Sequence, residues 1–328
     1  MPEATRGPAY LMSYPARNWG RGWAGVNFRS REAVTEAKHP RQAMREWIAL
    51  ADAIEQHGGR VYVVPPPKYD PPLNGMPFAA NFGIWSRSAS KPTYVLARPS
   101  VLHRQGEPRL LQLFWKSFDV ELAQPVSAWE GQADVQELPA NRFLVSWGPR
   151  SSKASVMEVI PHLPSGAVPF EVEIVKDPSG RYFHGDTVFS VVANPNGETY
   201  FLAYRDAVRS PAFGSLAEFV TGTGVREVIE LSLEDTLAYA ANGLEVNGTL
   251  IMPDGISSSL KGVLESRGFP VTVLPFHELF GKGGGGPRCQ VNVLREIPSQ
   301  VEEQLAPVAF SASRSKLVRV AHKYPNEI

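Results

Sequence analysis

The chain of 328 residues contains a single cysteine, Cys289, which follows the glycine run of residues 283–286 through Pro287 and Arg288. A single cysteine cannot form an internal disulfide. Its thiolate is a strong nucleophile, and glycines let backbone N–H groups come close enough to stabilise negative charge beside it. The alternative is a small buried hydrophobic residue, which is what most free cysteines are. The remaining motifs favour the nucleophile.

Three other short segments place polar or charged side chains among glycines and apolar residues. They are Phe78-Ala79-Ala80-Asn81-Phe82-Gly83, Trp129-Glu130-Gly131-Gln132-Ala133-Asp134 and Phe183-His184-Gly185-Asp186-Thr187. Taken singly, each has a structural alternative. Glu130 could lie in a solvated turn, His184 could be a satisfied structural histidine, and Asp134 could cap a turn or helix. Asn81 could occupy a left-handed turn beside Gly83.

Charge and hydropathy exclude several classes of function. The chain has 33 basic and 33 acidic residues, so it lacks the basic surface expected of a nucleic-acid-binding or membrane-surface protein. No apolar run reaches the about 18 residues that span a bilayer, and the first ten residues show no signal-peptide pattern. We expect a soluble, cytoplasmic protein with a small-molecule or protein partner.

No cofactor motif is present. Lys282 stands before glycines, but the spacing of a phosphate-binding P-loop is missing. The histidines, Cys289 and the carboxylates form no short zinc-ligand pattern. We expect neither a metal nor an organic cofactor.

A repeated unit of helix, glycine turn and strand positions these motifs along the chain. The spacing predicts a helix over residues 41–56 with a strand near 61–63, and a helix over 257–266 with a strand near 271–273. A weaker copy covers residues 156–174. Further strands are predicted near residues 94–97, 142–147, 187–193, 199–203 and 248–252. Because no linker separates the copies, we predict one domain over residues 1–328. A plain three-layer α/β sheet is the alternative.

The four motifs together resemble those of the pentein superfamily of guanidino-group-modifying enzymes. In chain order, that superfamily has Phe-x-x-(Asp or Asn)-x-Gly, Glu-Gly-x-x-Asp, His-x-Asp and a glycine-rich loop that ends in cysteine. Residues 78–83, 130–134, 184–186 and 283–289 match these motifs in the same order. The resemblance implies a five-bladed α/β propeller of ββαβ repeats around a pseudo-fivefold axis, with the active site in the central channel.

The resemblance also implies roles for the residues. Cys289 would be the nucleophile, His184 the general acid and base, and Glu130 the carboxylate that holds the histidine and the substrate. The remaining candidates would bind the substrate; they are Asp186, Asn81, Asp134, Arg150 and Asn27. Within that set, Arg150 resembles an arginine that binds the carboxylate of an amino acid in related hydrolases.

The residue at position 81 favours one reaction within the superfamily. Asparagine at position 81 is similar to the dihydrolases, whereas deiminases and most amidinotransferases have aspartate there. We therefore expect a hydrolase that converts arginine or a derivative, through a covalent thiouronium intermediate, to ornithine and ammonia. The alternatives are an amidinotransferase with an amine acceptor, a deiminase, and a non-catalytic pentein. Arg288 before the cysteine is unusual and leaves the substrate shape open, and a homo-oligomer is an open expectation.

Overall fold

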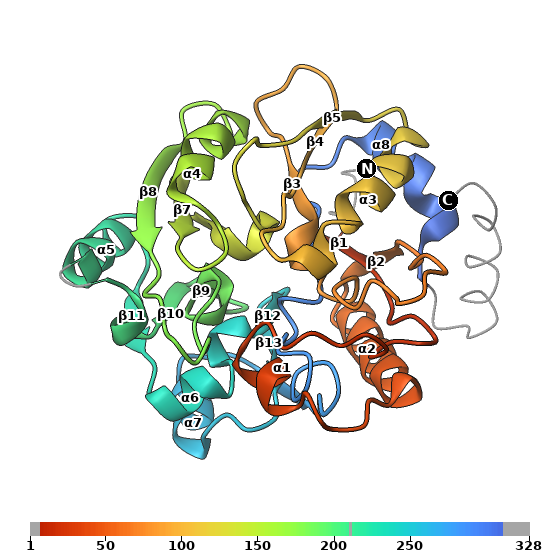
Figure 1. Cartoon of the computed structure of the whole chain (residues 1–328). Helices are drawn as coiled ribbons and strands as arrows, with labels where there is room; N and C mark the ends of the chain where they lie inside the picture. The colour runs from red at the N-terminus through yellow and green to blue at the C-terminus, as the bar shows by residue number, and fades with distance from the viewer. Residues whose placement is uncertain (1–6, 210–211, 311–328) are drawn as a thin grey trace.

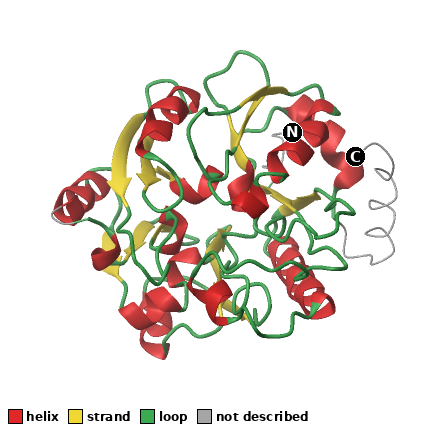
Figure 2. Ribbon diagram, viewed as in Figure 1, coloured by secondary structure: helices red, strands yellow, loops and turns green. Residues whose placement is uncertain are grey.

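The computed structural model describes residues 7–209 and 212–310, in which the strands form five sheets of three strands each. Figure 1 shows the sheets arranged around a common centre, with α2, α3, α4, α5 and α7 at the rim. The same view coloured by secondary structure shows long loops joining the elements across the face of the molecule (Figure 2).

The bounds of the elements are as follows. The strands are β1 (Ala9–Met12), β2 (Arg60–Val63), β3 (Gly83–Trp85), β4 (Thr93–Leu96), β5 (Glu121–Ala123), β6 (Val135–Leu138), β7 (Arg142–Trp147), β8 (Val168–Glu173), β9 (Phe189–Ala193), β10 (Thr199–Ala203), β11 (Glu227–Glu230), β12 (Leu244–Val246), β13 (Thr249–Pro253), β14 (Val271–Leu274) and β15 (Asn292–Val293). The α-helices are α1 (Phe28–Glu32), α2 (Pro40–Gln56), α3 (Glu107–Lys116), α4 (Lys153–Val159), α5 (Ala212–Thr221), α6 (Leu233–Leu237), α7 (Ser258–Ser266) and α8 (Ser299–Leu305).

Every sheet is built from the same ββαβ module. The modules are β3-β4-α3-β5, β6-β7-α4-β8, β9-β10-α5-β11, β12-β13-α7-β14 and β15-β1-α2-β2. In each, the middle strand pairs antiparallel with the first strand and parallel with the last, which follows the helix. A helical crossover is the usual way to join two parallel strands. The predicted five-bladed α/β propeller of ββαβ repeats is confirmed.

The last blade joins the two ends of the described chain. Its middle strand β1 pairs antiparallel with β15, with Tyr10 opposite Val293 and Leu11 opposite Asn292. It also pairs parallel with β2. The loop of residues 283–289, which carries Cys289 and precedes β15, is therefore held next to the first strand of the described chain.

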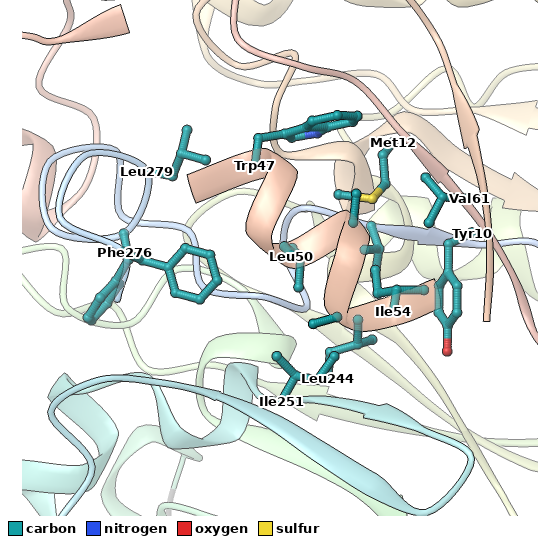
Figure 3. Packing of buried hydrophobic residues seen from close by; sticks show 14 of the residues in the cluster. Tyr10, Met12, Trp47, Leu50, Ile54, Val61, Leu244, Ile251, Phe276 and Leu279 are labelled. Atoms are coloured by element: carbon teal, nitrogen blue, oxygen red, sulfur yellow. The ribbon is translucent and has the colours of Figure 1, made fainter. Parts of the chain in front are cut away.

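Helix α2 illustrates how a blade is packed. The helix begins with Pro40, which is tolerated in the first turn because its missing N–H has no helical partner there. Trp47, Leu50 and Ile54 are fully buried on one face. Figure 3 shows this face against Tyr10, Met12 and Val61 of its own blade and Leu244, Ile251, Phe276 and Leu279 beyond it. Burial of one such aliphatic side chain contributes roughly 1.5–3 kcal/mol, so this core joins two adjacent blades.

A short turn leads into the first strand of each blade. Four are 3₁₀ helices, η1 (Ala79–Phe82), η3 (Gly131–Asp134), η5 (Gly185–Thr187) and η7 (Ala240–Asn242), and the fifth is the turn of residues 287–290. η1 contacts η3, η3 contacts η5, η5 contacts η7, and β15 contacts η1. The turns are therefore neighbours, although they come from five separate parts of the sequence.

The predicted elements agree closely with the observed ones. The helix predicted over 41–56 is α2, and the strands predicted over 142–147 and 199–203 are β7 and β10. The strand predicted over 187–193 begins later, at Phe189, because Gly185–Thr187 forms η5. That 3₁₀ turn is what carries Asp186 into the site.

Candidate active site

Glu130 and His184 form a buried pair. Nε2 of His184 lies 2.7 Å from Oε2 of Glu130, and both side chains are almost completely enclosed. Burial alone would raise the pKa of Glu130, but Arg150, the hydrogen bond from His184 and Arg104 together hold it well below its ordinary value. The carboxylate is therefore ionised, so that Nε2 of His184 carries the proton and Nδ1 is left as the basic atom.

Cys289 lies in the last turn, with only 3% of its surface exposed. Its Sγ is 3.5 Å from Oδ2 of Asp186, and its backbone N–H donates to Oδ1 of Asn242 at 3.0 Å. Burial, followed by the negative charge of Asp186, raises the pKa of the thiol well above its ordinary value, although Asn242 and Arg288 act in the opposite direction. The resting cysteine is a thiol that donates to Asp186.

Two polar atoms at the site are buried without a hydrogen-bond partner among the described residues. They are Nδ1 of His184 and Oδ1 of Asp186. Burial raises the pKa of Asp186 to about 6, against the opposing charges of His184 and Arg288. Because an unpaired buried polar atom costs free energy, these two atoms are available to a bound ligand.

Asn81 lies beside the Glu130–His184 pair with a fixed orientation. Its Nδ2 donates to the backbone oxygen of Glu130 at 2.8 Å and is 3.4 Å from the Glu130 carboxylate. Its Oδ1 accepts from the guanidinium of Arg104 at 2.6 Å. Arg104 is held in turn by Glu107, at 2.6 Å, in a buried ion pair. The amide therefore presents its donor side to the catalytic pair.

The front pocket is the cavity next to these residues. Its wall includes Trp23, Asn27, Phe78, Asn81, His103, Arg104, Arg150, Phe183, His184, Cys289 and the glycines 283–285. Glycine is required here by close contacts. A Cβ on Gly285 would lie 2.3 Å from the ring of Phe78, and one on Gly284, whose φ is +77°, would lie 2.4 Å from Oδ1 of Asn27.

Two predicted substrate ligands line the front pocket but already have protein partners. Arg150 is buried; it donates to Glu130 at 3.3 Å and to the backbone oxygen of Val26 at 3.0 Å. Asn27 caps α1 through Ser30 and donates to the backbone oxygen of Gly283 at 3.1 Å. In this structure Arg150 supports the charge of Glu130, and Asn27 fastens the glycine loop.

Asp134 is held by hydrogen bonds to neighbouring residues. Its carboxylate accepts from the hydroxyls of Ser146 and Ser151, at 2.6 and 2.5 Å, and from the N–H of Gly185 at 2.9 Å. In this structure the oxygens of Asp134 therefore hold the backbone next to His184, and its contact with substrate stays a prediction.

Sequence reasoning missed Asn242. This residue accepts from the Cys289 N–H and donates to the backbone oxygen of Asp186 at 2.9 Å, and it is fully buried. A signal was present, since Ala240-Ala241-Asn242 repeats the Ala79-Ala80-Asn81 of another blade. Internal repetition at blade spacing would have identified it.

His103 is a second missed residue of the pocket wall. Burial, and then the charges of Arg104 and Arg150, lower its pKa to about 4. The imidazole is therefore neutral at neutral pH. It lies in the residues after β4, where the sequence showed no motif.

The described residues contain neither a metal-binding cluster nor a membrane-spanning helix. In residues 7–209 and 212–310 no group of three or more His, Cys, Asp or Glu side chains is placed to hold a metal ion. In the same residues no helix has the length and apolar character required to cross a membrane.

Comparison with known proteins places the fold. No protein-family model matches the chain. An uncharacterised protein of Caenorhabditis elegans is 27% identical over 259 residues, which are 77% of this chain and 83% of the relative. Among solved structures, the N-terminal domain of ArgZ, an arginine dihydrolase from the ornithine–ammonia cycle in cyanobacteria, is similar with a TM-score of 0.75 and 22% identity, covering 88% of this chain and 98% of that one.

A second solved structure belongs to a different enzyme. DDAH from Pseudomonas aeruginosa, a cysteine-to-serine mutant complexed with citrulline, has a TM-score of 0.66 and 17% identity, and the match covers 88% of this chain and 99% of that one. ArgZ and DDAH are both penteins. The chain described here therefore has the pentein fold that its motifs predicted.

Proposed function

We propose that this protein is a cofactor-independent cysteine hydrolase that acts on the guanidino group of arginine or a close derivative. One observation carries the proposal. The Cys289 thiol and the His184 imidazole line one pocket; His184 is paired to an ionised glutamate, and the thiol contacts the Asp186 carboxylate, whose other oxygen has no partner among the described residues. These side chains come from three separate blades. The solved structures with the same fold include an arginine dihydrolase, which supports this chemistry.

Substrate binding is the first step of the proposed mechanism. A guanidinium is planar and cationic, so a carboxylate that accepts its N–H groups can fix its orientation. Asp186, with Oδ1 free, supplies such an acceptor close to Cys289. Glu130 holds His184 and, through its negative charge, favours the imidazolium that forms during proton transfer.

The chemical steps use Cys289 and His184. Nδ1 of His184 accepts the proton of the Cys289 thiol as the sulfur attacks the guanidino carbon to form a C–S bond, and the imidazolium passes that proton to the nitrogen that leaves as ammonia when its C–N bond breaks. Water, deprotonated by His184, then attacks the thiouronium carbon; the C–S bond breaks and a ureido compound results. A second round on the ureido compound would remove the remaining carbonyl group as carbon dioxide, with a second ammonia, and release ornithine.

Asn81 supports complete removal of the guanidino group. A second round requires the site to hold first a cation and then a neutral ureido group. The amide of Asn81 is neutral, and its donor side faces the catalytic pair. Aspartate would add a negative charge beside Glu130.

The substrate itself is expected to generate the thiolate. Burial and Asp186 hold the pKa of Cys289 high in the empty site, and a bound guanidinium opposes the charge of Asp186. We predict that the pKa of Cys289 falls when a non-hydrolysable guanidino ligand binds. Ultraviolet absorbance of the thiolate as a function of pH, taken as the difference from Cys289→Ala so that the tyrosines cancel, measures it, because the chain has one cysteine. A thiol pKa that does not change would refute this step.

Substrate affinity should depend on the ionisation of Asp186. The pKa of this carboxyl is about 6 in the empty site, so below pH 6 it is mainly neutral and loses its attraction for a cation. We predict that arginine binding to the Cys289→Ala variant weakens by up to about tenfold for each pH unit below that value. Isothermal titration calorimetry measures the dissociation constant on both sides of pH 6.

The matched control for that titration is Asp186→Asn in the same Cys289→Ala background. An amide cannot titrate, so binding should become weak and lose its dependence on pH in this range. If Asp186→Asn binds arginine with an unchanged affinity and pH profile, Asp186 does not hold the guanidinium.

Product identification tests the proposed function. Purified protein is incubated with arginine and a panel of guanidino compounds, with and without added amines, and the products are identified by mass spectrometry. Ornithine and ammonia without an acceptor would support the dihydrolase, and citrulline as the end product would indicate a deiminase. A product that forms only with an added amine and carries the amidino mass would replace the hydrolase with an amidinotransferase.

A further inference from the structure

A second cavity, the rear chamber, lies among the first strands of all five blades. Its wall includes Ile84 and Trp85 of β3, residues 135–137 of β6, residues 190–192 of β9, Leu244 and Glu245 of β12 and Val293 of β15. It shares no lining residue with the front pocket. Arg288 belongs to the wall of the rear chamber, whereas the adjacent Cys289 belongs to the front pocket. The turn of residues 287–290 therefore stands between the two cavities.

The charged side chains of this wall are three arginines and two glutamates: Arg87, Arg288, Arg295, Glu137 and Glu245. Glu137 is bound by two of the arginines, Arg87 at 2.9 Å and Arg295 at 3.1 Å. Glu245 accepts from the N–H of Gly248, and burial raises its pKa. Arg87 also pairs with Glu296, so that Arg87 and Arg295 are both matched by carboxylates.

Among the described residues, Arg288 is the arginine of this wall that no carboxylate contacts; the charge of Asp186 acts on it without a hydrogen bond. Within residues 7–209 and 212–310 it has no ion pair. Its guanidinium donates to two neutral oxygens, the backbone oxygen of Val291 at 3.0 Å and Oε1 of Gln132 at 3.1 Å. Gln132 is itself fixed by Val293, to which it donates at 2.6 Å and from which it accepts at 2.8 Å. The guanidinium is thus held rigidly at the cavity wall.

A half-buried guanidinium without a counter-ion attracts anions. Its planar set of donors fits the two oxygens of a carboxylate or two oxygens of a phosphate. Arg295, which follows β15, is already paired with Glu137, so Arg288 is the arginine that such an anion would meet. We propose that the rear chamber binds a small oxyanion, a carboxylate or a phosphate, on Arg288.

An anion at this site would act on the nucleophile. Arg288 precedes Cys289 and lowers the pKa of its thiol through its positive charge. A bound anion cancels part of that field, so less thiolate forms at a given pH. The lower fraction of Cys289 thiolate matters for catalysis only if the proposed function is correct. Binding of the anion to Arg288 does not depend on that function.

Calorimetric titration of the full-length protein with inorganic phosphate, and separately with malonate, at constant ionic strength tests the site. We expect saturable binding with one anion per chain, and the tighter anion identifies the ligand class. In Arg288→Gln the affinity should fall by about tenfold or more, because a charge-assisted hydrogen bond is lost. In Arg150→Gln, which removes an arginine of the front pocket, the affinity should be unchanged.

The opposite pattern overturns the proposal. If Arg150→Gln loses binding and Arg288→Gln keeps it, the anion occupies the front pocket. Absence of saturable binding of either anion would also overturn it. If Arg288→Gln does not fold, the rate at which Cys289 is alkylated in the unaltered protein still tests the site. Phosphate should slow alkylation of Cys289 by iodoacetamide several-fold, and an unchanged rate contradicts the site whether or not arginine is turned over.

Discussion

Replacing Cys289 with alanine should abolish the turnover of guanidino substrates and leave the fold intact. The thiol is the only sulfur nucleophile of the chain that could attack the guanidino carbon, and loss of a covalent nucleophile typically lowers kcat by roughly 10⁴-fold or more. Alanine removes one buried atom from a turn whose backbone is held by Asn242. Ornithine and ammonia release from arginine, measured at matched enzyme concentrations, gives the loss.

Two readouts separate a chemical loss from a structural one. Circular dichroism and thermal unfolding should be close to those of the unaltered protein, and arginine should still bind. Cys289→Ser offers a matched comparison, since it keeps the size and a hydrogen-bond donor toward Asp186 but is a far weaker nucleophile. Turnover that survives in Cys289→Ala would overturn the mechanism.

The second large effect concerns the end product. Asn81→Asp should stop the reaction at the ureido stage, so that arginine gives citrulline in place of ornithine. The new carboxylate would still accept from a guanidinium and from Arg104, but it would lie near the carboxylate and backbone oxygen of Glu130 and would repel the oxygen of a ureido group. Mass spectrometry of the products over time distinguishes the two outcomes.

Asn27→Asp is the control for the added charge. It places a carboxylate in the same front pocket, at a helix N-cap where aspartate can still accept from the N–H of Ser30, and Asn27 has no hydrogen bond to Glu130 or His184 among the described residues; the variant loses the donation to the Gly283 oxygen. Its product should remain ornithine. If Asn81→Asp also continues to remove the whole guanidino group, the role given to Asn81 is wrong.

The fold was largely predictable, because in three blades a glycine turn returns the helix to a strand. Gly58, Gly166 and Gly268 adopt left-handed backbone conformations in these turns. In the blade with α3, strand β4 was predicted but the helix and β5 were not, because Asp119, with φ +54°, stands where those blades have glycine. In the blade with α5, the first two strands were predicted but the helix and β11 were not, because β11, Glu227–Glu230, has two adjacent apolar residues and shows no alternation.

The residues that lie together at the site were predictable from the motifs. The contacts that each side chain makes were less predictable, because they depend on the tertiary structure. Cys289, His184, Glu130, Asp186 and Asn81 lie together as their motifs predicted. Asp134 belongs to the same motif as Glu130 but points toward serine hydroxyls. That difference follows from the 3₁₀ turn η3, which separates the two side chains, and no local pattern shows it.

The structure also shows where Arg288, the unusual residue before the cysteine, lies. The sequence left the substrate shape open because of Arg288. It lines the rear chamber and is absent from the wall of the front pocket, because successive side chains of the turn are directed to different cavities. Backbone geometry of an irregular turn is not encoded by residue spacing, so sequence alone could not make this assignment.

The central claim is a covalent bond between Cys289 and the guanidino carbon. The most direct measurement is mass spectrometry of the intact protein, quenched with acid during turnover of arginine labelled at that carbon, followed by peptide mapping. The account predicts a labelled adduct on the peptide that contains Cys289, which appears before product and is absent from Cys289→Ala. The account would be contradicted if product accumulates without a burst, no labelled adduct is found on that peptide, and Cys289→Ala remains active.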